Sequence, residues 1–252
     1  LRTVNRLFDS MAEYFISDAH LGQADRGKEE LKFRKLRSFF DMVAAKGERL
    51  YILGDLFDFW FEYKHAIPKE HVSVLFELSK LIESGVKLTY ITGNHDFWLG
   101  DLLTRQLGVE VFKDELTVTH DGKRIFLIHG DGLAKKDRGY RILKKIMRNR
   151  FNIFLYRQVP PDIGIPFAKF CSRLSRGHTS ERPKESFLRE YRDYAQRKLN
   201  DGYDCVISAH THYPEQIEYE NGVYINTGDW CVNFTYAVLK DGRLELKWWD
   251  KQ

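Results

Sequence analysis

The chain of 252 residues has few cysteines and no long apolar run, and each absence excludes a class of protein. The three cysteines, Cys171, Cys205 and Cys231, are odd in number and widely spaced. They predict neither a disulfide framework nor a zinc knuckle, and they favour a reducing compartment. The nearest candidate for a membrane span, residues 151–170, is interrupted by charged residues and three prolines, so we expect no span. We also expect no secretory leader and assign no role to residues 1–10.

Composition and charge predict a folded protein with an anionic partner. Hydrophobic residues make up 43% of the chain and charged residues 30%, a balance typical of a globular protein, and the length suits one α/β domain. The formal net charge is only +4, but residues 135–198 contain 18 Lys and Arg against six Asp and Glu. Because such a concentration of charge attracts counter-charges, this segment predicts a phosphate, nucleic-acid or anionic lipid partner.

Short apolar runs alternate with helical patterns in the first half of the chain. This alternation predicts βαβ units, and hence a buried sheet with helices on its faces. The expected strands are 13–17, 50–53, 88–92, 124–128 and 204–208, and the expected helices are 29–45 and 72–82. Turn signals at 220–222 and 240–242 predict hairpins near the end of the chain. We therefore expect an α/β fold of the α+β sandwich type.

A basic segment with helical patterns, at about 133–200, separates two of the expected strands. Its position between core strands indicates an insertion in a single domain that spans residues 1–252. A helical lid over the functional site is the architecture that such an insertion predicts.

Side chains that can bind metals follow directly after five of the expected strands. They lie in the turns at 18–20, 55–58, 94–96, 129–131 and 210–212. Because open α/β sheets bind ligands at the carboxyl ends of their strands, we expect these Asp, His and Asn side chains to meet. Phosphoester hydrolysis needs a hydroxide and a counter-charge, and two metal ions about 3.5–4 Å apart supply both. Imidazole and carboxylate ligands suit Mn, Fe or Zn better than Ca.

The blocks D-x-H, G-D-x-x-D, G-N-H-D, H-G and H-x-H, in this order, resemble the calcineurin-like metallophosphoesterase family. The resemblance spans residues 18–212. It implies a two-sheet β-sandwich flanked by helices, and two divalent metal ions, with manganese expected and iron or zinc as alternatives. The implied ligands are Asp18, His20 and His212 for the first metal, Asn94, His129 and His210 for the second, and Asp55 as the bridge between them.

The same resemblance implies two catalytic residues. His95 is expected to donate to a phosphate oxygen or to the leaving group, and Asp58 to orient its imidazole. One departure is Ala209, where the family commonly has Gly. We expect little effect from the added methyl group unless the backbone there needs a positive φ.

Within the family, the stretches 51–57, 93–97 and 129–131 resemble a branch that acts in lipid A biosynthesis. That branch hydrolyses the pyrophosphate of a UDP-acylated glucosamine, giving UMP and an acylsugar 1-phosphate. His95 and Asp58 depart from it, since it commonly has Arg and Glu there, and they match the general family pairing. Apolar lid residues are expected either to contact acyl chains or to form a helical core: Phe151, Ile153, Phe154, Leu155, Ile165 and Phe167.

Basic lid residues are the expected substrate contacts. The candidates are Arg138, Arg141, Arg148, Arg150, Arg176 and His178. Three histidines outside the motifs, His65, His71 and His120, are expected to be solvated surface residues.

Two other functions fit the sequence at this point. A nuclease or cyclic-nucleotide phosphodiesterase of the same family could use the basic lid on a phosphate backbone. The lid aromatics cluster instead of alternating with basic residues, so we expect no dedicated nucleic-acid partner.

A basic interaction module with structural metals is the non-enzymatic alternative. The expected partner is a phosphorylated small molecule or glycolipid. The resemblance implies a cytoplasmic location and leaves open peripheral association with the inner face of the cell membrane.

Overall fold

A computed structural model describes residues 12–23, 25–134, 137–176 and 183–249, and within them the strands form two sheets. The first sheet has the order β11-β10-β1-β2-β3-β4 and the second the order β5-β6-β7-β9-β8. The strands are β1 (Ala12–Ile16), β2 (Gly47–Ile52), β3 (Lys87–Ile91), β4 (Glu110–Phe112), β5 (Glu115–His120), β6 (Lys123–Ile128), β7 (Cys205–Ser208), β8 (Glu215–Tyr219), β9 (Gly222–Asn226), β10 (Thr235–Lys240) and β11 (Arg243–Trp248). Strands β1 to β4 run parallel, as do β6, β7 and β9, so their carboxyl ends share one edge of each sheet.

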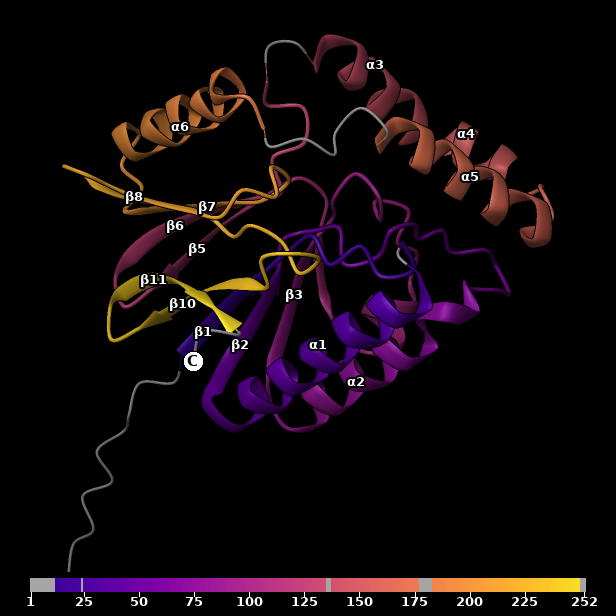
Figure 1. The fold of residues 1–252 in the computed structure, drawn as a ribbon, viewed down its shortest axis with the longest axis horizontal. Coiled ribbons are helices and arrows are strands. Elements are labelled where there is room, and N and C mark those ends of the chain that lie inside the picture. Colours follow the sequence, from indigo (N-terminus) through magenta and orange to yellow (C-terminus); the bar gives the residue numbers. More distant parts are fainter. Residues whose placement is uncertain (1–11, 24, 135–136, 177–182, 250–252) are drawn as a thin grey trace, which may run out of the picture.

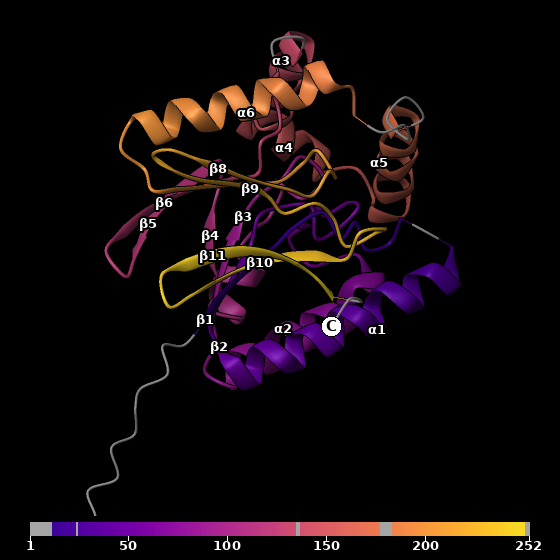
Figure 2. The same ribbon diagram turned by 60° about the vertical axis from the view of Figure 1, so that its left-hand side comes forward.

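Helices cover both outer faces of this sandwich. Helices α1 and α2 lie along the first sheet and α6 lies along the second, whereas α3, α4 and α5 gather to one side as a cap (Figure 1 and Figure 2). The helices are α1 (Arg26–Lys46), α2 (Val72–Glu83), α3 (Arg138–Met147), α4 (Arg150–Tyr156), α5 (Pro161–Arg176) and α6 (Glu185–Asn200), with short turns η1 (Lys69–His71) and η2 (Leu102–Gln106).

Large apolar side chains fill the space between the two sheets. Phe15, Tyr51 and Leu53 of the first sheet and its loops pack with Ile125 and Ile207 of the second. The rings of Phe15 and Tyr51 stack with their centroids 4.7 Å apart. Because strand side chains alternate between faces, the same strands present a second apolar face to α1 and α2. This burial on both faces fixes the strand ends and the loops that follow them.

Helix α1 shows how the sequence specifies one of these layers. The Asp25 side chain caps its start by accepting a hydrogen bond from the main-chain nitrogen of Lys28 at 3.1 Å. Leu36, Phe39 and Val43 recur at helical spacing, and all three are buried against the first sheet.

The predicted strands and helices are confirmed, with ends that shift by up to three residues. The two hairpin turns are confirmed as well. Strands β4 and β5 were not predicted. Both lie at sheet edges, β4 has only three residues, and β5 alternates exposed and half-buried side chains, so neither forms an apolar run.

The segment predicted as a lid, 133–200, contains two different structural parts. The cap, α3 to α5, stands beside the sandwich (Figure 1). Helix α6 instead packs on the second sheet through Tyr191, Ala195 and Leu199. It is therefore an outer layer of the sandwich and does not belong to the cap.

The expectation that His71 is a solvated surface residue is wrong. Its ring is 1% exposed, and it packs against Phe57 with ring centroids 4.6 Å apart. Its Nε2 donates to the carbonyl oxygen of Phe59 at 3.1 Å. His120 is half-buried, with Nδ1 3.2 Å from a carboxylate oxygen of Glu13, so it is not fully solvated either. The other histidine of this group, at position 65, is exposed as expected.

We predict that His71 makes the protein less stable as the pH falls. Burial lowers the pKa of its imidazole to about 4, whereas the unfolded chain protonates near pH 6.5. Between these values the unfolded state binds one more proton, so the free energy of unfolding falls with falling pH, by about 3 kcal/mol at most. Urea unfolding of the metal-free protein at pH 4 to 7 should therefore show a shallower pH dependence for His71→Gln. The exposed-site control His65→Gln should keep the original slope, and equal slopes in all three proteins would contradict the prediction.

Candidate metal centre

Loops that follow five strands bring the predicted ligands together at the carboxyl ends of the parallel strands of both sheets. They come from the ends of β1 (Asp18, His20), β2 (Asp55), β3 (Asn94), β6 (His129) and β7 (His210, His212). Five of these seven have positive φ values, between 41° and 69°: Asp18, His20, Asp55, His210 and His212. Residues other than glycine rarely adopt this conformation, and such strain gathers at functional sites.

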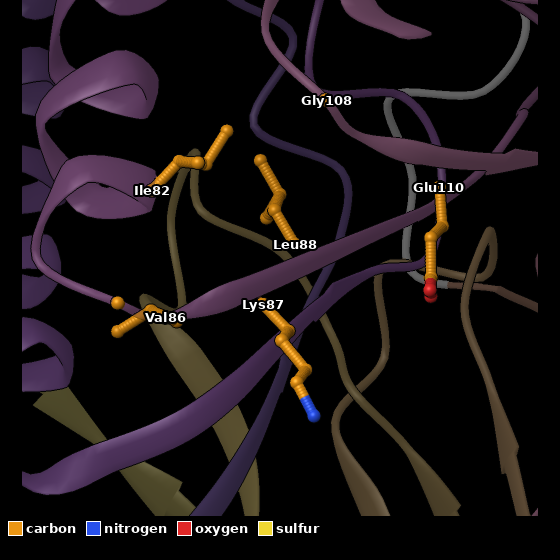
Figure 3. Close-up of a pocket in the computed structure, with 7 residues that line it drawn as sticks. Ile82, Val86, Lys87, Leu88, Gly108 and Glu110 are labelled. Atoms are coloured by element: carbon orange, nitrogen blue, oxygen red, sulfur yellow. The ribbon is translucent and has the colours of Figure 1, made fainter.

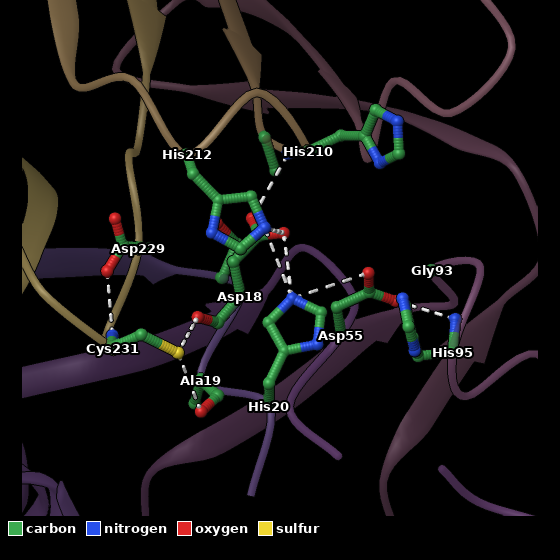
Figure 4. A network of polar contacts seen from close by, with 12 residues as sticks. Asp18, Ala19, His20, Asp55, Gly93, His95, His210, His212, Asp229 and Cys231 are labelled. Carbon is green, nitrogen blue, oxygen red and sulfur yellow. Dashed lines mark hydrogen bonds and ion pairs between the residues drawn. The ribbon is translucent and has the colours of Figure 1, made fainter. Parts of the chain in front are cut away.

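The first cluster consists of Asp18, His20 and His212, with Asp55 at its edge (Figure 4). The Nε2 atoms of the two histidines lie 3.2 Å apart. Oδ1 of Asp18 lies 3.7 Å from Nε2 of His20 and 3.4 Å from that of His212. Oδ2 of Asp55 lies 3.8 Å from Nε2 of His20. The His212 side chain is 42% exposed and the other three are buried, so the cluster opens to solvent at His212.

The second cluster consists of Asp55, His129 and His210, with Asn94 beside it. Nε2 of His129 lies 3.4 Å from Oδ2 of Asp55 and 3.1 Å from Oδ1 of Asn94. Nδ1 of His129 donates to the carbonyl oxygen of Leu53 at 2.7 Å, which directs Nε2 into the cluster. Oδ2 of Asp55 thus lies close to histidine nitrogens of both clusters.

Burial and charge move the pKa values of neighbouring groups in opposite directions. Burial opposes ionisation of Asp55, but His129 and His95 beside it outweigh burial and hold its pKa well below the usual range. Burial also opposes the charged form of His129, but the contact with Asp55 outweighs it and raises the pKa to about 10. Burial lowers the pKa of His20 and brings that of His210 to about 4. In the metal-free centre an ionised Asp55 carboxylate therefore faces a protonated His129, whereas the imidazoles of His20 and His210 are neutral. A divalent cation would displace the proton of His129, because a metal ligand must be deprotonated.

The geometry of the donors also fits a divalent cation. Oδ1 of Asp18 is buried without a hydrogen-bond partner, which is unusual for a carboxylate oxygen. Donor atoms in the first cluster lie 3.2 to 3.8 Å apart. This is close to the separation of neighbouring ligands around a cation with bonds of about 2.0–2.2 Å. Both clusters therefore fit the metal ions that their donor chemistry predicts.

His95 lies against these clusters, and its contact with Asp58 differs from a simple carboxylate–imidazole pair. Its ring meets that of His20 edge-on with centroids 4.7 Å apart, and its main-chain nitrogen donates to Oδ1 of Asp55 at 2.9 Å. Nδ1 of His95 donates to the main-chain carbonyl oxygen of Asp58 at 2.8 Å, whereas the nearest carboxylate oxygen is 4.0 Å away. Asp58 therefore contacts His95 most closely through its main chain.

Asp96, the last residue of the G-N-H-D block, has a structural role that the sequence did not assign. It accepts hydrogen bonds from the main-chain nitrogens of Gly93 at 2.9 Å and Phe57 at 3.4 Å, and from the hydroxyl of Tyr90. It thereby ties the loop after β3 to the loop after β2. Burial raises its pKa to about 6.

Ala209 stands where the family commonly has Gly. It is not among the described residues with positive φ, so its methyl group adds no backbone strain.

Polar contacts fix the cap to the edge of this centre. Asp131, at the end of the loop after β6, lies 2.9 Å from Nζ of Lys144 and accepts from the hydroxyl of Tyr140 at 2.6 Å. Nε1 of Trp98 donates to the carbonyl oxygen of Met147 at 2.9 Å. Helix α3 is therefore held by the loops that carry the second cluster.

The candidate substrate contacts lie along the cap in different environments. Arg141 donates to the carbonyl oxygen of Gly132 at 2.9 Å, and Arg148 forms an ion pair with Asp114 at 2.5 Å. Arg150 is exposed at the start of α4. Arg138 is the first residue of α3, and Arg176 is the last residue of α5. His178 lies outside the described residues.

The apolar residues of the cap divide between a small core and a set of exposed side chains. Ile153 and Ile165 pack with Phe61 and Tyr63, so part of the cap has a core of its own. The exposed residues have relative solvent-accessible surfaces of 48% to 65%: Ile142, Leu143, Ile146, Phe151, Phe154, Leu155, Ile163, Phe167 and Phe170. So many exposed large apolar side chains on three successive helices are typical of a part that contacts a ligand or a membrane. Among the described helices, none has the length and apolar composition of a membrane crossing.

A separate pocket of about 240 Å³ lies at the other end of the first sheet (Figure 3). It is lined by the start of β3, including Lys87 and Leu88, by Ile82 of α2, and by Glu110. Its lining contains one carboxylate and no histidine, so it lacks the donors of a metal-dependent enzyme site.

The fold and the clustered donors define a metal-dependent phosphoesterase. The chain belongs to the calcineurin-like phosphoesterase family, whose sequence model matches residues 14–214. The family that the five blocks indicated is therefore confirmed. Among its relatives is the UDP-2,3-diacylglucosamine hydrolase of Porphyromonas gingivalis, which is 34% identical over 93% of this chain and 96% of its own. The enzyme of the same name from Neisseria meningitidis serogroup B is 31% identical over 91% of this chain and 94% of its own.

A solved structure shows the same fold at low sequence identity. It is a phosphoesterase from E. coli that is 15% identical to this chain, with a TM-score of 0.50 over 96% of this chain and 95% of its own. This likeness supports the two-sheet α/β architecture predicted from the sequence.

Proposed function

We propose that this protein hydrolyses the pyrophosphate bond of UDP-2,3-diacylglucosamine, giving UMP and the acylated sugar 1-phosphate, a step of lipid A biosynthesis. The observation that carries the proposal is the combination of donor clusters for divalent cations with a cap that exposes apolar side chains. The substrate has the same two parts, a pyrophosphate and acyl chains. The two relatives described above are named as hydrolases of this compound.

We propose that the centre holds two divalent cations. Manganese is the expected metal for both, with iron or zinc as alternatives. When bound, such ions supply hydroxide near neutral pH and neutralise charge on the phosphoryl oxygens. The ligands of the first ion are Asp18, His20 and His212, those of the second are Asn94, His129 and His210, and Asp55 is shared.

In this proposal His95 acts on the substrate and Asp58 positions it. The water oxygen forms a bond to phosphorus, and the bond from phosphorus to the bridging oxygen breaks. With a proton on each ring nitrogen, His95 donates from Nε2 a hydrogen bond to a phosphoryl oxygen or a proton to the departing oxygen. The carbonyl of Asp58 accepts from Nδ1 and thereby orients the imidazole.

The cap supplies the remaining contacts with the substrate. Exposed apolar residues such as Phe154 and Phe167 contact the acyl chains. The proposed phosphate contacts are Arg138, Arg141, Arg148, Arg150, Arg176 and His178. For Arg141 and Arg148, substrate binding competes with the contacts that they already make. Because apolar and basic side chains together bind an anionic membrane surface, we place the protein at the inner face of the cell membrane.

Hydrolysis of UDP-2,3-diacylglucosamine by the purified protein with Mn²⁺ tests this function. Release of UMP should depend on the metal and stop on addition of EDTA. Turnover on the lipid should exceed turnover on an aryl phosphodiester, since only the lipid uses the cap. Equal or lower turnover on the lipid would contradict the substrate assignment and leave the phosphoesterase chemistry intact.

Substitutions in the cap separate substrate binding from chemistry. Phe154→Asp should raise KM for the lipid by about 10-fold or more, because burial of a Phe side chain contributes about 1.5–3 kcal/mol. Its turnover of an aryl phosphodiester should stay unchanged. Phe76→Asp is the matched control, since Phe76 is equally exposed but lies on α2. An unchanged KM for Phe154→Asp would contradict the acyl-chain role of the cap.

A further inference from the structure

A buried lysine lies directly behind the loop that carries the first cluster. Lys32, on α1, is only 4% exposed. Its Nζ donates to the carbonyl oxygens of Ala19 at 3.0 Å and His20 at 2.8 Å, and it lies 2.7 Å from Oε1 of Glu29. Lysines are rarely buried unless their charge is paired. Here the ion pair is with Glu29 of the same helix, and both hydrogen bonds go to the loop that carries Asp18 and His20.

The loop needs such support because its conformation is unusual. Asp18 and His20 both have positive φ values, and the residue between them contributes one of the two carbonyls that Lys32 holds. One ammonium group thus fixes two successive peptide planes. Glu29 holds the next turn, because its Oε2 accepts from the main-chain nitrogen of Gly22 at 2.9 Å. Helix α1 therefore fixes the loop from behind at both ends.

His20 depends on this support more than an ordinary metal-binding histidine does. Metal-binding histidines usually donate their second ring nitrogen to a partner, which orients the ring. Nδ1 of His20 is buried without a hydrogen-bond partner, and the nearest carboxylate oxygen, on Asp58, is 3.8 Å away. The direction of Nε2 toward the first cluster therefore depends on the main chain of His20, which Asp55 holds at the nitrogen and Lys32 at the carbonyl oxygen.

We propose that Lys32 is a positioning residue of the metal centre. It holds the main chain of Ala19 and His20 so that Asp18 and His20 present their donors to one cation. The inference rests on the proposed metal ligands and assigns no contact between Lys32 and the substrate. Donor positions matter to about 0.2 Å in a metal site, so a loosened loop weakens binding.

The charge of Lys32 makes the proposal testable, because its two effects on metal affinity have opposite signs. A positive charge near the cluster repels a cation, so a role through charge alone predicts tighter binding in Lys32→Met. A role in positioning predicts weaker binding in the same variant. Lys28→Met is the matched control for charge, since it removes one lysine from the exposed first turn of the same helix, where the side chain is 77% exposed.

The experiment is a titration of the metal-free full chain with Co²⁺, followed by calorimetry and by visible absorption. Lys32→Met should weaken one of the two binding steps by about 10-fold to 100-fold and change its absorption spectrum, as loss of outer partners of metal ligands does. The other step and both steps of Lys28→Met should match the wild type. Wild-type or tighter affinity in Lys32→Met overturns the proposal, as does an equal loss at both steps.

A second variant covers the case in which Lys32→Met does not fold. Lys32→Gln keeps a neutral hydrogen-bond donor next to Glu29 but is too short to reach both carbonyls. Circular dichroism establishes that the variant is folded, and the same loss at one binding step is expected. Wild-type affinity in folded Lys32→Gln overturns the proposal. Because the readout is Co²⁺ binding, a wrong assignment of the substrate does not change the result.

Discussion

Replacement of His95 by alanine should lower phosphoester turnover by roughly 10²-fold or more, the usual contribution of a general acid–base side chain. Metal binding should persist, because the main-chain nitrogen that donates to Asp55 is kept in His95→Ala. The measurement compares kcat for UMP release with metal content of the same preparation. His65→Ala is the matched control, since His65 is exposed and outside both clusters.

Two results would contradict this assignment of His95. Full activity in His95→Ala would show that catalysis needs only the metal clusters, and it would favour another proton donor. Loss of a metal ion together with activity would instead make His95 a ligand, which its proximity to His20 and Asp55 also permits. The comparison of activity with metal content distinguishes these two cases.

Asp55→Asn should have the largest effect of any single substitution in the centre. Oδ2 of Asp55 lies 3.8 Å from Nε2 of His20 and 3.4 Å from Nε2 of His129, so the substitution removes charge from both clusters. Metal ions contribute several kcal/mol to the stabilisation of such transition states. At about 1.4 kcal/mol per tenfold in rate, this corresponds to a loss on the order of 10³-fold. Metal analysis should show fewer bound ions than in the wild type.

The control for Asp55→Asn is Asp41→Asn, which removes a carboxylate from the exposed surface of α1. It should leave metal content and turnover unchanged. If Asp55→Asn bound both metal ions with wild-type affinity, Asp55 would not be the shared ligand. The two clusters would then be separate sites and not one centre.

Much of the site could be predicted because its signals are local in the sequence. Each proposed ligand follows an apolar run within a few residues, as Asp18 follows β1 and His129 follows β6. An apolar run predicts a buried strand, and parallel strands place their carboxyl ends at one edge of a sheet. The order of the blocks then indicated both the family and the residues to consider. Edge strands β4 and β5 gave no such signal, since their side chains are not buried on both faces.

The residues that were missed or misjudged depend on contacts between distant segments. His71 is buried because η1 folds against Phe57 and Trp60, which a polar turn does not indicate. Asp58 contacts His95 mainly through its carbonyl, and a side-chain motif carries no information about main-chain geometry. The division of 133–200 into a cap and α6 follows from which helix meets the second sheet.

The sequence by itself determined the strand order along the chain, the identity of the metal-capable side chains and the basic character of the cap. These follow from composition and from patterns within a few residues. Only the tertiary structure decided how those side chains are held, as Lys32 and Leu53 show. Their contacts with the loops of His20 and His129 join residues separated by 12 and 76 positions. Such contacts depend on the packing of helices and sheets, because a hydrogen bond forms only when folding brings donor and acceptor within about 3 Å.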